Sequence, residues 1–189
     1  MPLGPDDLFA SPEAIERLGQ WHDFQLGAES GKPAWFTVDG ISAFRQIGRD
    51  GAGGVFALLP PAQRVLYVSS EGQAGIVAAD FEAFIQLIVA HPYWRDILHF
   101  SGNGRLAEMR RAAEALEATL DDGEEVDESR DWLRSTFALA EPADPVGALH
   151  RAVSASDAVV RPHGGGEPFT TLFNRFTIDD SPLLRETVD

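Results

Sequence analysis

The five histidines are the side chains with the most versatile chemistry in this chain, because imidazole titrates near neutral pH and binds metals. They are scattered, and no helical His-x-x-x-His or His-Glu pair occurs among His22, His91, His99, His150 and His163. His91 and His99 bracket a segment that includes Asp96, so two histidines and one carboxylate are one interpretation. Packing or capping by single histidines is the alternative that we favour. We therefore predict no metal ligands.

Serine, glycine and cysteine offer no recognisable catalytic motif. Ser69-Ser70-Glu71-Gly72 lacks the form of a nucleophile elbow and predicts a turn. Gly51-Ala52-Gly53-Gly54 has no following Lys-Ser/Thr and leads into a strand, which favours a hairpin turn over a phosphate loop. Cysteine is absent, so disulfides, thiolate catalysis and thiolate metal sites are excluded. We expect a protein without catalytic residues or cofactor, and not an enzyme.

Carboxylates are concentrated between Asp121 and Asp131, where seven acids accompany one arginine. The ligand spacing in this run does not match an EF-hand calcium loop. A solvated linker is one interpretation, and a surface that binds a basic protein is the other. The residues that we expect to contact such a partner are Asp121, Asp122, Glu124, Glu125 and Asp127.

Two helix starts and a series of short strands make up the first half of the chain. Ser11-Pro12-Glu13 combines an N-cap, a proline at the first helical position and an acid in the first turn. Asp80 precedes a helix with apolar residues at i, i+3, i+4 and i+7, which are Phe81, Phe84, Ile85 and Ile88. Between them, turn residues separate strands expected over 35–38, 44–48, 55–59, 64–68 and 74–77. This order predicts an α+β fold, in which helices pack on an antiparallel meander of about four to six strands.

The second half of the chain is predicted to be mainly helical. Apolar residues from Leu106 to Leu120 recur at steps of three and four, and another helical segment begins near Trp132. Segments 158–160 and 169–173 flank Gly164-Gly165-Gly166 and predict a terminal hairpin. We expect residues 1–104 to form the α+β domain, and residues 105–189 to form a mainly helical extension packed on it as one compact unit.

The charge balance restricts the kind of partner. Thirty acidic against fifteen basic residues give a net charge of −15, which repels nucleic acid and anionic membranes and attracts basic proteins. Solubility alone is the other interpretation of this charge. The longest apolar stretch, 84–90, is far below the roughly 18 residues that span a bilayer. With no signal-peptide pattern, we expect a cytoplasmic protein without a membrane partner. Abundant Arg, Ala and Gly, with Lys32 as the single lysine, favour a GC-rich bacterial genome.

An ordered series of residues between Ala43 and Val89 resembles the SUKH superfamily, which includes bacterial toxin-immunity proteins and fungal regulators of cell-wall synthesis. A strand ends at Ile47-Gly48, a glycine turn spans 50–54, strands follow at 55–57 and 64–68, and Ser70-Glu71-Gly72 precedes the Asp80 helix. In that helix, Asp80-Phe81 and Phe84-Ile85 match a sequence motif typical of the family. The chain departs from the family at 26–29, where the usual Leu-Pro pair is absent. Residues from 105 onward carry no motif that we assign.

The resemblance implies a non-catalytic immunity protein that neutralises a cognate basic toxin, of nuclease type, by occluding its surface. Glu71 then joins the acidic run as a candidate contact, and exposed members of Trp35, Tyr93 and Trp94 become candidate anchors, with core packing as the alternative. A competing function is an intracellular regulatory or scaffold module that binds a housekeeping protein. A small-molecule enzyme or sensor is a third, which a deep pocket holding His91 or His99 beside carboxylates would favour. Nothing in the sequence indicates the oligomeric state.

Overall fold

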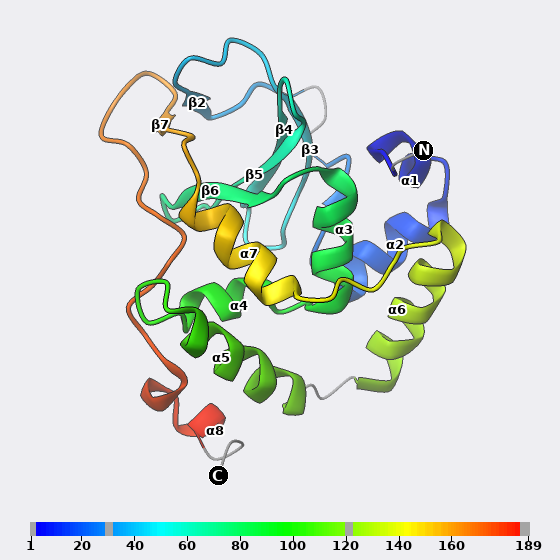
Figure 1. Ribbon diagram of the computed structural model, residues 1–189. Coiled ribbons are helices and arrows are strands. Elements are labelled where there is room, and N and C mark those ends of the chain that lie inside the picture. The colour runs from blue at the N-terminus through cyan, green and yellow to red at the C-terminus, as the bar shows by residue number, and fades with distance from the viewer. Residues whose placement is uncertain (1–2, 29–31, 120–122, 186–189) are drawn as a thin grey trace.

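The computed structural model describes residues 3–28, 32–119 and 123–185, which form an α+β fold (Figure 1). The strands are β1 (Gln25–Leu26), β2 (Phe36–Val38), β3 (Arg45–Arg49), β4 (Val55–Leu59), β5 (Arg64–Val68), β6 (Ala74–Ala78) and β7 (Val160–Pro162). The helices are α1 (Pro5–Phe9), α2 (Pro12–Trp21), α3 (Phe81–Ala90), α4 (Trp94–His99), α5 (Leu106–Ala118), α6 (Gly123–Phe137), α7 (Pro145–Ser154), the 3-10 turn η1 (Ile178–Asp180) and α8 (Pro182–Arg185).

The central element is a five-stranded antiparallel sheet in the order β1-β3-β4-β5-β6. Along the chain, β3 pairs with β4, β4 with β5 and β5 with β6, with Val55 opposite Val68 and Tyr67 opposite Gly75. The predicted meander is thereby confirmed. Strand β1 adds to the outer edge of β3 and was not predicted, because two residues carry no periodic signal.

Both faces of this sheet are buried. Every residue of β4 is buried, since its alternate side chains enter two different hydrophobic clusters. On one face Phe56 packs edge-on against Phe24, with ring centroids 5.1 Å apart, and lies 5.0 Å from Phe84 of α3. The other face is covered by β2 and β7 and contributes Val55, Ala57, Leu59, Leu66, Val68 and Ile76. The sheet is therefore a layer between two hydrophobic clusters.

Strands β2 and β7 form a separate antiparallel ribbon, seen beyond the edge of the main sheet in Figure 1. Phe36 pairs with Pro162, and Val38 pairs with Val160. The 35–38 segment, expected in the meander, thus belongs to a second sheet. Because β7 comes from the second half of the chain and β2 from the first, the ribbon ties the two halves together.

The predicted terminal hairpin is wrong in its pairing. Val160 accepts one backbone hydrogen bond from Phe169, at 2.8 Å, but the ladder partner of β7 is β2. Thr170 instead bridges in parallel to the turn before β6. Pro162 and Pro168 have no backbone N–H to donate. The expected hairpin therefore loses backbone hydrogen bonds on both sides of the glycine turn.

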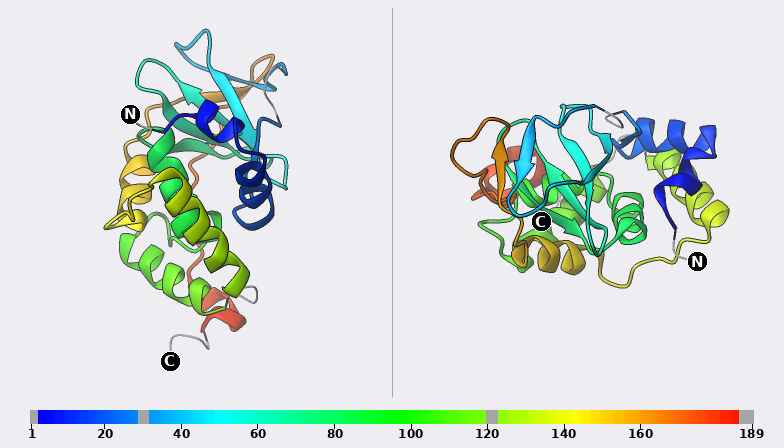
Figure 2. Two further views of the ribbon diagram at one scale, coloured as in Figure 1. Left: turned by 90° about the vertical axis from the view of Figure 1, so that its right-hand side faces the viewer. Right: turned by 90° about the horizontal axis from the view of Figure 1, so that it is seen from above.

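Both predicted helix starts are confirmed. The Ser11 hydroxyl accepts a hydrogen bond from the Ala14 amide at 3.2 Å, and the Asp80 carboxylate accepts one from the Ala83 amide at 2.8 Å. The apolar stripe of α3, including Phe84 and Ile85, is buried against the sheet. In the left view of Figure 2 the strands lie in the upper part of the molecule, and α5, α6 and α8 extend below them.

The residues after 104 are mainly helical, as expected. Helix α7 packs along β6 and α3, and α6 packs against α2 and α3. A single hydrophobic cluster contains Leu8, Phe84, Leu133, Leu149 and Leu172, so residues on both sides of position 104 share one core.

Candidate functional site

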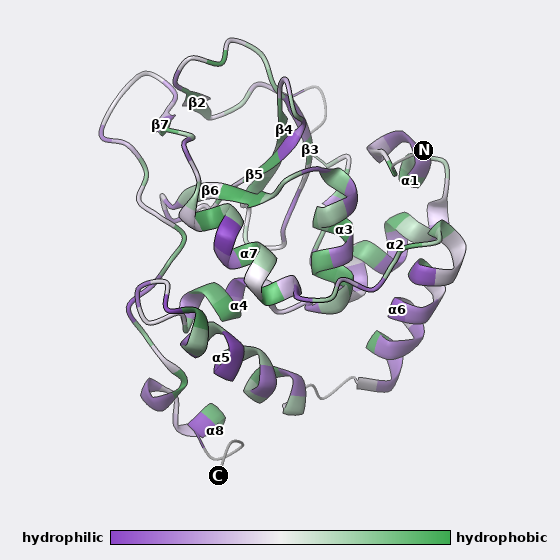
Figure 3. Cartoon of the chain, in the orientation of Figure 1, coloured by the Kyte–Doolittle hydropathy of each residue, from purple (hydrophilic) through white to green (hydrophobic). Residues whose placement is uncertain are grey.

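Helix α6 presents a row of exposed carboxylates. The part of the acidic run from Gly123 onward is helical and is not a linker. Five of its acids are exposed, and the helix is coloured mainly as hydrophilic in Figure 3; they are Glu124, Glu125, Asp127, Glu128 and Asp131. We call these residues the α6 acidic face.

A groove of about 460 Å³ separates this face from the first turns of α2. Glu13 and Glu16 of α2 and Glu125 and Glu128 of α6 supply four carboxylates to its lining, and Trp21 supplies an aromatic edge. One arginine, Arg17, also lines the groove. Its guanidinium donates to Glu13 at 3.0 Å and to Glu128 at 3.3 Å, and lies 5.1 Å from the centre of the Trp132 ring. The groove retains a net negative charge after this pairing.

Arg130, on the inner side of α6, holds the helix against the end of α3. Its side chain is 8% exposed, and it donates to the carbonyls of Val89 at 3.1 Å and Ala90 at 3.1 Å. These carbonyls belong to the last turn of α3, where an α-helix leaves acceptors unpaired and where positive charge is favoured. Arg130 also pairs with Glu117 at 2.7 Å and Asp127 at 2.9 Å.

His22 forms a second link between α3 and α6 and connects both of them to the end of α2. Its side chain is fully buried, with Nδ1 3.0 Å from the Ile88 carbonyl and Nε2 3.0 Å from the Ser129 hydroxyl. A carbonyl only accepts, so Nδ1 carries the proton and Nε2 accepts the hydrogen bond from Ser129. Burial lowers the pKa of His22 from 6.5 to about 4. The imidazole is therefore neutral at pH 7 and acts as a structural bridge from α2 to α3 and α6.

The predicted contact residues fall in three places. Glu124, Glu125 and Asp127 lie together on the α6 acidic face, although Asp127 is already paired with Arg130. Asp121 and Asp122 lie outside the described residues. Glu71 is exposed in the turn after β5 and lines a separate polar cavity of about 250 Å³, with Tyr67, Arg95 and His99.

Tyr93 and Trp94 are not surface anchors, which corrects their prediction as partner contacts. Trp94 is 1% exposed and packs edge-on against Tyr67, with ring centroids 5.1 Å apart. Tyr93 is 8% exposed. Both belong to the start of α4, a helix without a side-chain cap, which sequence patterns did not reveal. Trp35 is the ring that remains exposed, at 39%, on the β2–β7 ribbon.

The hydroxyl of Tyr93 connects His91 to Glu117. It donates a short hydrogen bond to the Glu117 carboxylate, and His91 Nδ1 lies 3.0 Å from the same hydroxyl. Burial raises the pKa of Tyr93 and lowers that of His91. Burial alone would raise the pKa of the Glu117 carboxyl, but hydrogen bonds from Arg130 and Tyr93 hold it below its ordinary value. Each of these groups already has a protein partner, so the cluster has the character of a structural network.

A second buried network was missed by sequence reasoning. Asp50 accepts hydrogen bonds from the Tyr67 hydroxyl at 2.6 Å, from Arg95 at 2.7 Å and from the Gly54 amide at 2.8 Å. Arg95 also forms a short ion pair with Asp23. Burial, followed by the hydrogen bond to Asp50, raises the pKa of Tyr67. The network fixes the turn before β4 to α4. From the sequence, Asp50 was predicted only as part of a turn.

Comparisons with known proteins do not place this chain in a family. No family model matches it, no curated protein matches it, and no solved structure matches it. Within residues 3–28, 32–119 and 123–185 there is no helix long and apolar enough to cross a membrane. In the same residues, no group of three or more His, Asp or Glu side chains is arranged to hold a metal ion. The similarity to the SUKH superfamily thus stays a prediction based on residues 43–89.

Proposed function

We propose that this chain is a non-catalytic cytoplasmic protein that binds a basic partner protein through the α6 acidic face and the neighbouring turns of α2. The observation that carries this proposal is the set of exposed carboxylates that line the groove from both helices, Glu13, Glu16, Glu125 and Glu128. In the SUKH interpretation the partner is a cognate toxin of nuclease type, and the protein is its immunity protein.

The electrostatics support such a role. A nuclease needs a basic surface for its substrate, and a protein of net charge −15 is attracted to that surface over long range. Once docked, the carboxylates occupy the positions that phosphates would take. Association is then fast at low salt, and occlusion of the surface alone is sufficient to neutralise the toxin.

The construction of α6 also supports binding. Val126, Ser129, Arg130 and Leu133 are buried on its inner side, so the outer carboxylates are held on a fixed helix. A preorganised surface loses little conformational entropy when it binds. The acidic groups need no rearrangement to meet a flat or convex basic surface.

An intracellular regulatory or scaffold module that binds a housekeeping protein is the second candidate, because it would use the same acidic face. The identity of the partner separates the two. The immunity interpretation requires that the partner be toxic and be encoded beside this gene, whereas the scaffold interpretation requires a growth defect on deletion in the absence of any toxin.

The test uses the purified product of the adjacent gene as the probe. We expect a complex whose affinity falls with added salt, and protection of cells that express both proteins. Substituting Glu124→Gln and Glu125→Gln together should weaken binding, by about twofold to fivefold for each charge. The matched control is Asp39→Asn with Glu167→Gln, which removes the same charge from exposed positions beside the β2–β7 ribbon, away from the α6 acidic face.

Equal weakening by both pairs of substitutions would show that net charge matters and that this face does not. Absence of any complex, together with undiminished toxicity in co-expressing cells, would exclude the immunity role.

A further inference from the structure

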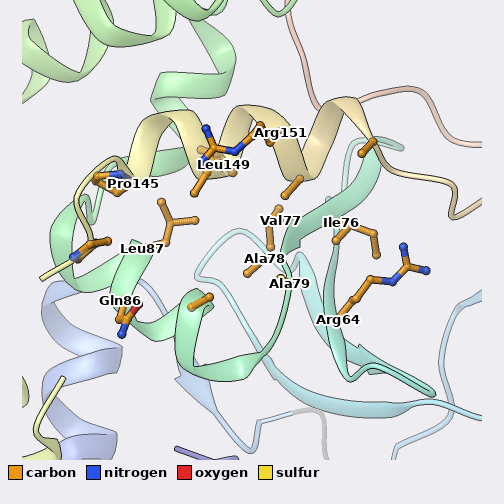
Figure 4. A pocket seen from close by; sticks show the side chains of 15 residues that line it. Arg64, Ile76, Val77, Ala78, Ala79, Gln86, Leu87, Pro145, Leu149 and Arg151 are labelled. Atoms are coloured by element: carbon orange, nitrogen blue, oxygen red, sulfur yellow. The ribbon is translucent and has the colours of Figure 1, made fainter. Parts of the chain in front are cut away.

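An apolar groove lies between β6, α3 and α7, on elements that take no part in the α6 acidic face. Its volume is about 450 Å³, within the range of about 300–1,000 Å³ typical of sites for small organic ligands. Small and aliphatic side chains line it, including Ala78, Ala83, Leu87, Leu149 and Ala152. In Figure 4 the lining side chains extend from Pro145 near one end of the groove to Arg64 at the other.

The charged groups that line the groove are all of one sign. They are Arg64 and Arg151, and no described Asp or Glu side chain joins the lining. Both guanidiniums pair with carboxylates outside the lining, Asp157 and Asp144, so the charged groups that a ligand meets in the lining itself are positive and favour an anionic ligand group. The remaining polar side chain of the lining, Gln86, is uncharged.

Both arginines keep N–H donors for a ligand. Arg64 donates from one nitrogen to Asp157 at 2.7 Å, and Arg151 makes a longer contact of 3.5 Å with Asp144. These are partly exposed ion pairs, which contribute little to stability and exchange readily with another carboxylate. A guanidinium has five N–H donors, so neither side chain is saturated by its present partner.

From this groove we infer a binding site for a single-chain apolar carboxylate, such as a medium-length fatty acid. The acyl chain lies along the alanine-lined trough between α3 and α7, and the carboxylate is held by the guanidinium of Arg64 at one end. Each buried methylene contributes to affinity through removal of apolar surface from water. The site is independent of the proposed protein-binding role.

The experiment is calorimetric titration of the full chain at about 0.15 M salt, where the repulsive field of the protein is screened. Dodecanoate, decanoate and dodecanol are the probes. We expect saturable 1:1 binding of dodecanoate, about fourfold weaker binding for each methylene removed, and about tenfold weaker binding of the uncharged alcohol. The double variant Arg64→Gln/Arg151→Gln should bind dodecanoate no better than dodecanol.

Two further variants test the location. Ala148→Trp places a large ring at an exposed lining position of α7 and should abolish binding of both the acid and the alcohol. Ser154→Trp on the same helix and Arg110→Gln, which lies outside the lining and pairs with Asp144, are the matched controls and should leave both affinities unchanged. All of these changes are at surface-accessible side chains, and a thermal melt of each variant checks that it is folded.

Equal affinity for acid and alcohol would overturn the carboxylate assignment, and dodecanoate binding that survives Ala148→Trp would overturn the location. If dodecanoate fails to bind while Ala148→Trp disrupts the complex with the adjacent gene product, the groove holds an aliphatic side chain of the partner, and the inference is wrong. Because none of these residues lies on α6 or α2, loss of the ligand site leaves the proposed toxin binding intact.

Discussion

Acidification should destabilise this protein well above the pH at which its carboxylates are protonated, and His22 is the reason. In the fold the imidazole has a pKa of about 4, whereas the ordinary value of 6.5 applies in the unfolded chain. The unfolded chain therefore binds more protons below pH 6.5, and the stability present at neutral pH is lost as the pH falls from 6.5 toward 4. The difference corresponds to about 3 kcal/mol, a large part of the stability of a typical domain.

The measurement is urea unfolding, followed by tryptophan fluorescence, at a series of pH values between 7.5 and 4.5. Parent and His22→Gln are compared, because glutamine can still hydrogen-bond but does not titrate. We expect His22→Gln to be less stable at pH 7.5 and to lose much less stability on acidification. Other groups that titrate in this window, such as His91, are common to both proteins and cancel in the comparison. Parallel stability curves for the two proteins would refute the assignment of the acid sensitivity to His22.

Three further substitutions test the packing that positions the candidate site. Arg130→Met should destabilise the fold by about 3 kcal/mol in urea unfolding, because it leaves the Val89 and Ala90 carbonyls without their buried donor. A loss of stability below about 1 kcal/mol would show that water replaces the guanidinium. Gly48→Ala should lower the midpoint of thermal unfolding and the free energy of unfolding by about 2–3 kcal/mol, since the new Cβ would lie 2.6 Å from the Phe24 ring and 2.7 Å from a backbone oxygen. An unchanged midpoint would mean that β1 moves to make room for the methyl group. Ser11→Ala should cost about 1 kcal/mol through loss of the N-cap of α2, with Ser11→Thr as the control that retains it.

The layers of the fold were predictable because their signals are local. The Ser11 and Asp80 caps, the hairpin turns and the apolar stripe of α3 each lie within a few neighbouring residues, and the structure reproduces all of them. The pairing of β2 with β7 was not predictable in this way. The two strands are more than a hundred residues apart in the chain. The sequence of a three-residue strand does not indicate which other strand it pairs with.

The candidate site was predicted only in part for the same reason. The acidic residues of α6 were recognisable from composition, but their position beside Glu13 and Glu16 depends on tertiary packing of α2. The prediction of Tyr93 and Trp94 as surface anchors was wrong because exposure cannot be read from residue type. Trp94, for example, fills the core between Tyr67 and Phe56. The Asp50–Arg95 contact joins residues 45 positions apart, and no local pattern announces it.

The two sides of α6 differ in what they contact: one side packs against the protein and the other faces solvent. Ser129, Arg130 and Leu133 attach the helix to the rest of the molecule, while Glu124 and Glu125 face solvent. If the outward carboxylates bind the partner, as proposed, the positions that select the partner can be varied without disturbing those that maintain the fold. A library randomised at the outward positions should yield mostly folded members, and in the proposed binding role these members would differ in the partner proteins that they bind.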